Sequence, residues 1–282
     1  MPNNPKDGKQ EFLHQERISD SAFFDLDEVS LPDTKYPHTL PTFEKFNQCV
    51  KNLGILKDDV LVVYDKSGIF SSPRAAWTFA LFGHPKVYLL DNYVNYRESE
   101  YPISTGAVET FATPLANETP EYFPITKEEY LNNYANQVIE YEELLGLLDN
   151  GRLSQDYVTF DARPNDRFTG KAPEPRPGLS SGHIPGALSL PFSKVINAQD
   201  KRYKSKDELL EIFKSDFGLD ISNSDFLKDK KGIIVMCGSG VTAVVLRFAI
   251  ESILGLKVPI RVYDGSWTEW ADRAPEKYIE KS

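Results

Sequence analysis

Residues 233–246 read Ile-Ile-Val-Met-Cys-Gly-Ser-Gly-Val-Thr-Ala-Val-Val-Leu. The first four are apolar and mostly β-branched, which predicts a short buried strand that ends just before Cys237. A glycine-containing turn follows, and an apolar helix is expected over 241–254. Strand, turn and helix in this order build parallel α/β sheets, which bind ligands at the carboxyl ends of their strands. The segment therefore predicts an α/β fold with Cys237 at the ligand-binding edge.

The same order of elements occurs earlier in the chain. Buried strands are expected at 60–64 and 87–90, with a helix over 73–82 between them. The first of these strands is followed by Asp65, which lies 172 residues before Cys237 in an equivalent position. The two halves are thus predicted to be similar α/β domains, one with an Asp where the other has a Cys.

The pattern of apolar residues is lost between the two repeats, where Thr, Pro, Ala and Glu dominate. We therefore predict a first domain over 1–103, a linker over 104–135 and a second domain over 136–282. A capping-box pattern at 126–129 predicts the start of a helix inside the linker region.

Composition limits the possible functions. The chain has 282 residues and a formal net charge of −10, from 32 Lys and Arg against 42 Asp and Glu. Direct nucleic-acid binding is not expected from a chain without a basic footprint. No apolar run approaches the roughly 18–20 residues that cross a bilayer, so no membrane insertion is expected. Residues 1–10 show neither an apolar leader nor an arginine-rich amphipathic pattern, which favours the cytosol.

The chain has two cysteines, Cys49 and Cys237. Neither has a Cys or His neighbour at zinc-ligand spacing, and the pair forms no disulfide framework. We expect free thiols in a reducing compartment, with no metal and no cofactor. Cys49 lies in the apolar pattern of a predicted helix, which favours a structural role.

The turn after Cys237 favours an anion. Gly238 and Gly240 allow successive backbone N–H groups to point inward, and such a nest makes a thiol ionise more easily. The alternative is a small buried hydrophobe at the end of a strand. A cysteine phosphatase would need an arginine six residues after the cysteine, where this chain has Ala243. The remaining chemistry is a negatively charged sulfur species such as a persulfide, which requires a thiol open to water and amides that face it.

Three motifs resemble those of the rhodanese-like sulfurtransferases: the loop 237–243, Gly-His-Ile-Pro-Gly-Ala at 182–187, and Tyr-Asp-Gly-Ser-Trp-Thr-Glu-Trp at 263–270. The loop is most similar to the 3-mercaptopyruvate sulfurtransferase branch. Residues 71–77 and 83–90 are similar to fungal members that supply sulfur for wobble-uridine thiolation of tRNA.

The resemblance implies two tandem rhodanese-like domains, each a parallel sheet flanked by helices, of which the first is inactive and the second carries the reactive cysteine. Members of the family begin with a strand and a helix before the segment that matches 17–27. No such strand precedes that segment here. We therefore expect a first domain that lacks its leading strand and exposes a sheet edge, either because the domain is degenerate or because Met1 is an internal start of a longer gene product.

The resemblance also implies roles in the cysteine loop. Cys237 would take sulfur from a donor and pass it to an acceptor in a double displacement. The loop residues Gly238, Gly240, Val241 and Thr242 would stabilise the anionic sulfur through their backbone N–H groups. Ser239 would hand a proton to the leaving enolate.

Outside the loop, Arg167 and Arg176 would hold the carboxylate and ketone of mercaptopyruvate. Thiosulfate-preferring members place two cations where this chain has Gly238 and Ser239, which favours mercaptopyruvate, although thiosulfate stays open. His38 matches a histidine that the family contributes from the first domain. The accompanying acid follows a serine directly in the family, but Ser30 is followed by Leu31, so Asp33 is assigned this role.

Three functions follow. The first is an enzyme that transfers sulfur from 3-mercaptopyruvate to a thiol or protein acceptor. The second is a persulfide carrier in a tRNA-thiolation relay, which would act through another protein because the chain is acidic. The third is an inactive rhodanese scaffold. The resemblance leaves a cytoplasmic and a mitochondrial location open.

Overall fold

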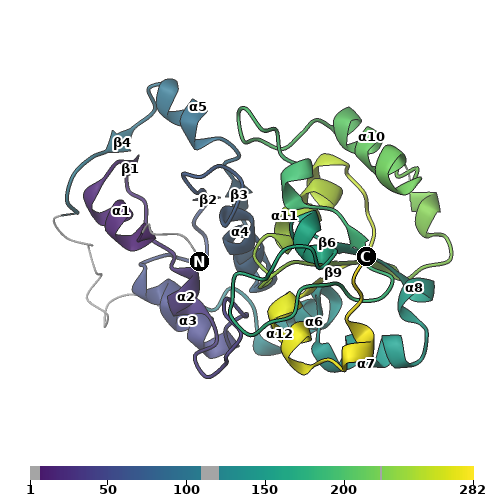
Figure 1. Cartoon of the computed structure of the whole chain (residues 1–282). Helices are drawn as coiled ribbons and strands as arrows, with labels where there is room; N and C mark the ends of the chain where they lie inside the picture. The colour runs from purple at the N-terminus through teal and green to yellow at the C-terminus, as the bar shows by residue number, and fades with distance from the viewer. Residues whose placement is uncertain (1–6, 109–120, 223) are drawn as a thin grey trace.

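The computed structural model describes residues 7–108, 121–222 and 224–282, in two α/β domains that lie side by side (Figure 1). Residues 109–120 of the predicted linker lie outside the described residues. The first domain contains α1 (Gly8–His14), β1 (Arg17–Ile18), α2 (Leu26–Val29), α3 (Phe43–Asn52), β2 (Leu61–Val63), α4 (Ser72–Leu81), β3 (Val87–Leu89), α5 (Tyr93–Glu98) and β4 (Ile103–Ser104).

The elements that follow begin with a helix between the two domains. They are α6 (Lys127–Gln137), β5 (Val138–Ile139), α7 (Tyr141–Asp149), α8 (Leu153–Asp156), β6 (Tyr157–Asp161), α9 (Asn165–Phe168), β7 (Leu188–Ser189), α10 (Lys206–Phe217), β8 (Gly232–Met236), α11 (Ala243–Phe248), β9 (Ile260–Tyr263) and α12 (Ser266–Arg273). The predicted capping box is confirmed, since Thr126 and Glu129 exchange hydrogen bonds at the start of α6.

The second domain is built on a parallel sheet of five strands in the order β5-β9-β8-β6-β7. Both of its faces are covered. Ile233 and Val235 of β8 belong to one apolar cluster, and Ile234 and Met236 belong to another. A strand buried on both faces is expected to be apolar throughout, as β8 is. The sheet therefore fixes Cys237, the next residue, at its carboxyl edge.

The first domain is smaller. Its β2 and β3 form a two-stranded parallel sheet, and β1 pairs with β4 in a separate antiparallel one. In the second domain β6 lies between β8 and β7, but among residues 7–108 no strand pairs with the other edge of β2. Over the described residues, the pairing of β2 with β3 therefore repeats only part of the parallel sheet of the second domain, and the chain has the two α/β domains that its internal repeat predicts.

Buried strands were predicted at 60–64 and 87–90. Strands β2 and β3 form there, but one face of their two-stranded sheet is exposed to solvent. Val62 and Tyr88 are paired in register and are 55% and 60% exposed. Helix α4 packs against β2 and β3 from one side, so only the residues that point toward α4 are shielded. Apolar composition alone does not reveal whether a second layer covers a strand.

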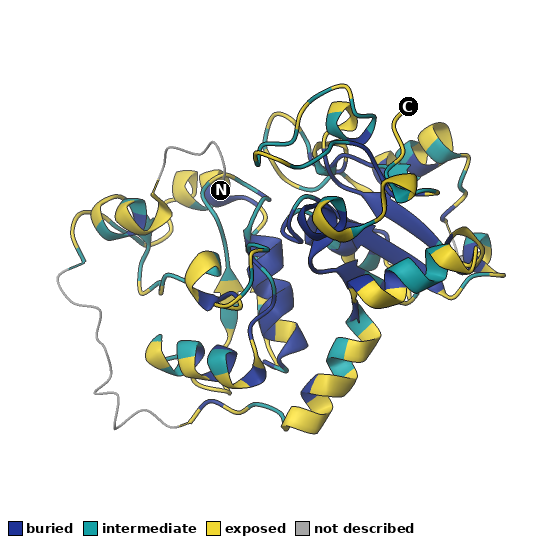
Figure 2. Ribbon diagram, turned by 60° about the horizontal axis from the view of Figure 1, so that its bottom comes forward, coloured by how far each residue is buried: buried dark blue, intermediate teal, exposed yellow. Residues whose placement is uncertain are grey.

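Helix α4 lies at the centre of the molecule, between the domains. Nine of its ten residues are buried, and it packs against α11 and α6 (Figures 1 and 2). Trp77 donates its indole N–H to Gln137 at 3.0 Å, which links α4 to the end of α6. The two domains therefore share a continuous apolar core.

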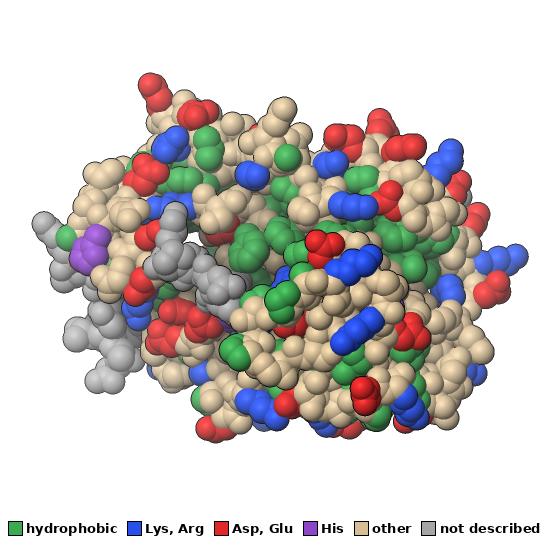
Figure 3. Space-filling view, in the orientation of Figure 1, with side chains coloured by type: hydrophobic (Ala, Val, Ile, Leu, Met, Phe, Trp, Pro, Cys, Tyr) green, Lys and Arg blue, Asp and Glu red, His purple; other side chains and the backbone are tan. Residues whose placement is uncertain are grey.

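The surface carries both signs of charge. On the face in Figure 3, acidic and basic side chains are interspersed over both domains. Over the part of the chain that the structure describes, none of the helices combines the length and apolarity of a membrane span.

Candidate active site

Ser266 shapes the loop 237–242, which we call the cysteine loop. Its hydroxyl oxygen accepts the backbone N–H groups of Cys237 and Gly240, each at 3.1 Å, and its own proton goes to the carbonyl of Tyr263 at 2.7 Å. Ser266 is fully buried and has a φ of 52°, a left-handed conformation uncommon for residues other than glycine. Such strain persists only where surrounding contacts enforce it. The sequence indicated a turn here but not this link to the cysteine loop.

Four other N–H groups of the cysteine loop remain unpaired. In the described ranges, those of Gly238, Ser239, Val241 and Thr242 donate to no acceptor. Buried backbone donors are normally paired, so a cluster of unpaired ones suits an anionic ligand. The N–H of Gly240 was predicted to face the sulfur as well, but it is directed to Ser266.

Gly240 contributes its conformation instead. Its φ is +75°, and a Cβ there would lie 2.7 Å from the carbonyl oxygen of Asp264 and 3.1 Å from Nη1 of Arg74. A larger residue would push the loop away from both neighbours. Gly238, by contrast, has open space around the position of a Cβ.

The first domain has a similar loop and fills it with its own carboxylate. Asp65 follows β2 closely, as Cys237 follows β8. Its Oδ2 accepts the N–H groups of residues 70, 71 and 72 at 3.2, 3.0 and 2.9 Å. The backbone N–H groups of this loop between a strand and a helix therefore bind a negatively charged group. In the second domain a thiol takes the place of that carboxylate.

Cys237 is only 2% exposed, whereas the sequence predicted a thiol open to water. The first domain covers the cysteine loop, since His38 contacts Ser239 and Arg74 contacts Gly240. The prediction failed because a sequence does not show which segment of one domain lies over a loop of the other. Cys237 therefore lies at the domain interface, shielded from bulk water.

His38 reaches the cysteine loop from the first domain. Its Nδ1 lies 2.9 Å from Oγ of Ser239, and its Nε2 lies 2.9 Å from Oδ1 of Asp27. A carboxylate only accepts, so in the neutral ring Nε2 carries the proton and Nδ1 accepts the hydroxyl proton of Ser239. Burial lowers the pKa of His38 to about 4, against the opposing charge of Asp27. The ring is therefore neutral at pH 7.

The acid next to His38 is Asp27, where the sequence had assigned Asp33. Asp33 is exposed in a turn beyond α2. Asp27 lies in the first turn of α2, whose N-cap Asp25 accepts the backbone N–H of Asp27 at 3.0 Å. The short helix α2 was not predicted, so its position ahead of Ser30 could not guide the assignment.

Arg176 lies beside the cysteine loop. Its Nη1 donates to Oγ1 of Thr268 at 3.3 Å, and Thr268 donates to the carbonyl of Gly238 at 2.6 Å. Burial lowers the pKa of Arg176, while the charges of Cys237 and Glu174 act in the opposite direction. The structure thus brings Arg176 and Cys237 into one electrostatic environment.

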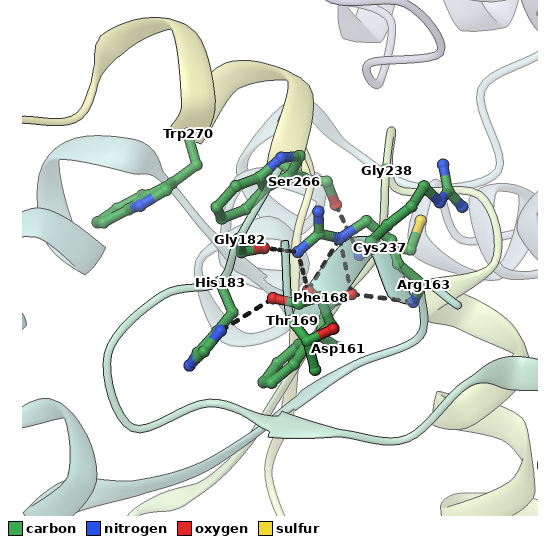
Figure 4. A network of polar contacts seen from close by, with 12 residues as sticks. Asp161, Arg163, Phe168, Thr169, Gly182, His183, Cys237, Gly238, Ser266 and Trp270 are labelled. Carbon is green, nitrogen blue, oxygen red and sulfur yellow. Dashed lines mark hydrogen bonds and ion pairs between the residues drawn. The ribbon is translucent and has the colours of Figure 1, made fainter. Parts of the chain in front are cut away.

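Arg167 is held by a buried acid, Glu174, which accepts from it at 3.4 Å. Glu174 also accepts from Arg163 at 2.7 Å. The Arg163 side chain is fully buried, binds both carboxylate oxygens of Asp161 and lies over the ring of Trp267 at 4.0 Å. Figure 4 shows Arg163 and Asp161 near Cys237. The sequence identified Arg167 but not Arg163, whose partners are distributed over a long loop.

His183 packs against Phe168 of the second domain. Its Nδ1 lies 2.9 Å from the carbonyl of Phe168, and the two rings stack with centroids 4.0 Å apart (Figure 4). These contacts hold the loop that carries the arginines against the strand that follows it.

The chain is similar to known proteins in sequence and in fold. The model of the rhodanese-like domain matches residues 140–273. The thiosulfate sulfurtransferase Tum1 of Saccharomyces cerevisiae is 39% identical over the whole chain and 89% of its own length. Its crystal structure superimposes with a TM-score of 0.85 at 37% identity, covering 100% of this chain and 88% of that one.

Two further proteins are similar. A probable 3-mercaptopyruvate sulfurtransferase of Schizosaccharomyces pombe is 35% identical over 98% of this chain and 85% of its own. A sulfur transferase subunit of yeast mitochondrial complex I, solved by cryo-electron microscopy, has a TM-score of 0.80 at 35% identity, covering 100% of this chain and 90% of that one.

Proposed function

We propose that this chain, which belongs to the tandem-rhodanese sulfurtransferases, takes sulfur from 3-mercaptopyruvate onto Cys237 as a persulfide and passes it to a thiophilic acceptor. It is a sulfurtransferase, as its curated relatives are. The observation that carries the proposal is the cysteine loop, where Cys237 is followed by four N–H groups without an acceptor among the described residues, in the position that Asp65 has in the first domain.

In the first half-reaction the Cys237 sulfur attacks the sulfur of mercaptopyruvate, and the carbon–sulfur bond breaks. The electron pair of that bond stays on carbon, which gives the enolate of pyruvate. The thiol proton of Cys237 passes through Ser239 to Nδ1 of His38, where Asp27 stabilises the imidazolium. The same proton then returns through Ser239 to the enolate carbon. The products are pyruvate and a Cys237 persulfide, which the cysteine loop holds as an anion. The substrate's own thiol proton is released to solvent and is regained when the sulfur leaves.

In the second half-reaction the acceptor takes the outer sulfur, and Cys237 returns to its thiol form. With cyanide the products are thiocyanate and free enzyme. Covalent storage of the sulfur implies ping-pong kinetics. Because Cys237 is 2% exposed, the segment around His38 that covers the cysteine loop must move to admit each reactant.

Mercaptopyruvate is the donor that suits the site. Its carboxylate can pair with Arg176, which lies beside Cys237 and has a single side-chain partner in Thr268 in the described chain. Arg167, close to Arg176, would contact the ketone or the carboxylate. Thiosulfate needs only the amides of the cysteine loop, so we propose it as a secondary donor.

The acceptor is proposed to be a small thiol or a protein. The net charge of −10 disfavours direct contact with tRNA, so a thiolation relay would run through a protein partner. The complex I subunit in yeast mitochondria supports a mitochondrial location for this chain.

Steady-state turnover tests the proposal. With 3-mercaptopyruvate and cyanide, the enzyme should form pyruvate and thiocyanate in equal amounts, with parallel double-reciprocal lines as each reactant is varied. Absence of turnover with every donor would support the inactive scaffold. Intersecting lines would contradict a persulfide intermediate.

Loss of the proton relay through Ser239 and His38 should slow the reaction with mercaptopyruvate but not the reaction with thiosulfate. Replacing His38 (His38→Ala) should lower mercaptopyruvate turnover by about 10²-fold, the range of general acid–base catalysis. Thiosulfate releases sulfite, which leaves as an anion without protonation at carbon, so its turnover should change little. Initial rates with both donors on one enzyme preparation provide the measurement, and an equal loss with both would contradict the relay.

The pH dependence should reflect the low pKa of His38. Nδ1 accepts a proton only while the ring is neutral, so the relay is active above the pKa of about 4 and is lost as pH falls through it. The ratio of wild-type to His38→Ala single-turnover rates should therefore stay constant from about pH 7.5 to about pH 5.5, whereas an unperturbed histidine would titrate near 6.5. A ratio that halves near pH 6.5 would contradict the account.

The link from Ser266 to the cysteine loop gives a further expected result. The change Ser266→Ala removes the acceptor of two buried N–H groups, and each unpaired group costs about 1–3 kcal/mol. The free energy of unfolding should fall by about 2 kcal/mol or more, and turnover should fall with both donors. Ser205→Ala is the control, since Ser205 only caps α10. It should cost about 1 kcal/mol without changing turnover; equal turnover in the two variants would refute the role of Ser266.

A further inference from the structure

A buried ion pair across the domain interface has no role in the steps above. Arg74, on α4 of the first domain, lies with Nη2 2.5 Å from Oδ1 of Asp264, at the end of β9 in the second domain. Their side chains are 1% and 8% exposed. Desolvating two charges is costly, so a buried pair is weak evidence of a gain in stability and calls for another explanation.

The pair fixes the backbone that carries His38. Nη2 of Arg74 donates to the carbonyl of His38 at 2.8 Å, and Oδ2 of Asp264 accepts the N–H of Leu40 at 2.7 Å. His38 has a φ of 63°, which is unfavourable for a residue with a side chain. The ion pair thus holds both ends of a strained turn whose imidazole points at Ser239.

The same guanidinium also contacts the cysteine loop. Nη1 of Arg74 donates to the carbonyl of Gly240 at 3.3 Å, next to Ser239. The face of Trp77 lies 5.1 Å away and limits the movement of the guanidinium. Arg74 therefore contacts the backbone of His38 and the backbone of Gly240, the residue that follows Ser239.

We propose that Arg74 and Asp264 are positioning residues that set His38 against Ser239. Through them the first domain, which has no reactive cysteine of its own, takes part in the reaction. The inference rests on the proposed function, because His38 needs exact placement only if it exchanges a proton with Ser239. It predicts that the shape of the guanidinium matters, and not only its charge, since one ammonium cannot reach three acceptors held in a fork.

The test is Arg74→Lys in two backgrounds. In the otherwise wild-type enzyme, mercaptopyruvate turnover should fall by about ten- to a hundredfold, as expected for small misplacement of a reacting group. Thiosulfate turnover should fall far less. In the His38→Ala background the same substitution should cause no further loss of mercaptopyruvate turnover, because the group that it positions is already absent.

Two further variants distinguish the loss of positioning from a general loss of stability. Arg247→Lys is the matched control, since Arg247 is also buried and also lies near Trp77, at 6.0 Å, but donates to the carbonyl of Ile260 and forms an ion pair with Glu251. It should leave the ratio of the two donor rates unchanged. Asp264→Asn keeps the size of the side chain and removes its charge, so it should reproduce the donor-selective loss of Arg74→Lys.

The outcomes separate the two claims. Donor-selective loss in both Arg74→Lys and Asp264→Asn that disappears without His38 supports positioning. Equal loss with both donors, or a loss that persists without His38, assigns the pair to stability alone and overturns the inference. If His38→Ala itself leaves mercaptopyruvate turnover intact, the proton relay of the proposed function has failed.

Discussion

Replacing the thiol of Cys237 by a hydroxyl (Cys237→Ser) is expected to abolish sulfur transfer from mercaptopyruvate and from thiosulfate, by at least about 10³-fold. A hydroxyl cannot store sulfur as a persulfide, and no other route connects donor and acceptor in a double displacement. The substitution changes one atom in a well-packed site, so the unfolding transition should stay close to that of the wild type. Initial rates and denaturant unfolding on the same sample give the measurement.

Cys49→Ser is the matched control for Cys237→Ser. Cys49 is half-buried in α3, and burial raises the pKa of its thiol, so it is a poor nucleophile. This variant should keep wild-type turnover. Retained transfer in Cys237→Ser, or lost transfer in Cys49→Ser, would contradict the assignment of the nucleophile.

Arg176→Ala is expected to lower kcat/KM for mercaptopyruvate by roughly 30-fold or more, because truncating one partner of a buried charge pair costs 2–5 kcal/mol. Thiosulfate has no carboxylate for Arg176 to pair with, and should lose much less. Arg176→Lys should recover only part of the loss, since an ammonium does not match the two oxygens of a carboxylate. Steady-state kinetics with the two donors distinguish these outcomes.

The exposed Arg202, paired with Asp200, offers a control for the loss of one positive charge. Arg202→Ala should change neither rate. An equal loss for both donors in Arg176→Ala would remove the carboxylate role and leave Arg176 as a general electrostatic feature of the cysteine loop.

Local patterns predicted the elements of this fold well. The apolar run at 233–236 falls within β8, and the helix expected over 73–82 corresponds to α4. These signals are local because a strand in the middle of a parallel sheet is apolar on both faces. The exposure of Val62 could not be predicted in this way, since it depends on whether another element covers that face of β2 and β3.

The site was predictable in part, and for similar reasons. Cys237, Ser239 and His38 were found from motifs, and the structure brings all three together. Asp27, Arg74 and Ser266 were missed because each acts through a partner 11 to 190 residues away in the chain. A single sequence does not reveal which of its distant residues are in contact in the folded chain. The sequence repeat predicted that Asp65 and Cys237 occupy equivalent positions. It did not predict that the Asp65 carboxylate accepts the N–H groups of its own loop.

The most direct test of the account is the mass of the protein after one equivalent of 3-mercaptopyruvate and no acceptor, followed by peptide mapping. We predict a gain of one sulfur atom per chain, located on the peptide that contains Cys237, with one pyruvate released and the sulfur removed again by cyanide. Pyruvate release with no added sulfur, or sulfur located on Cys49, would contradict it.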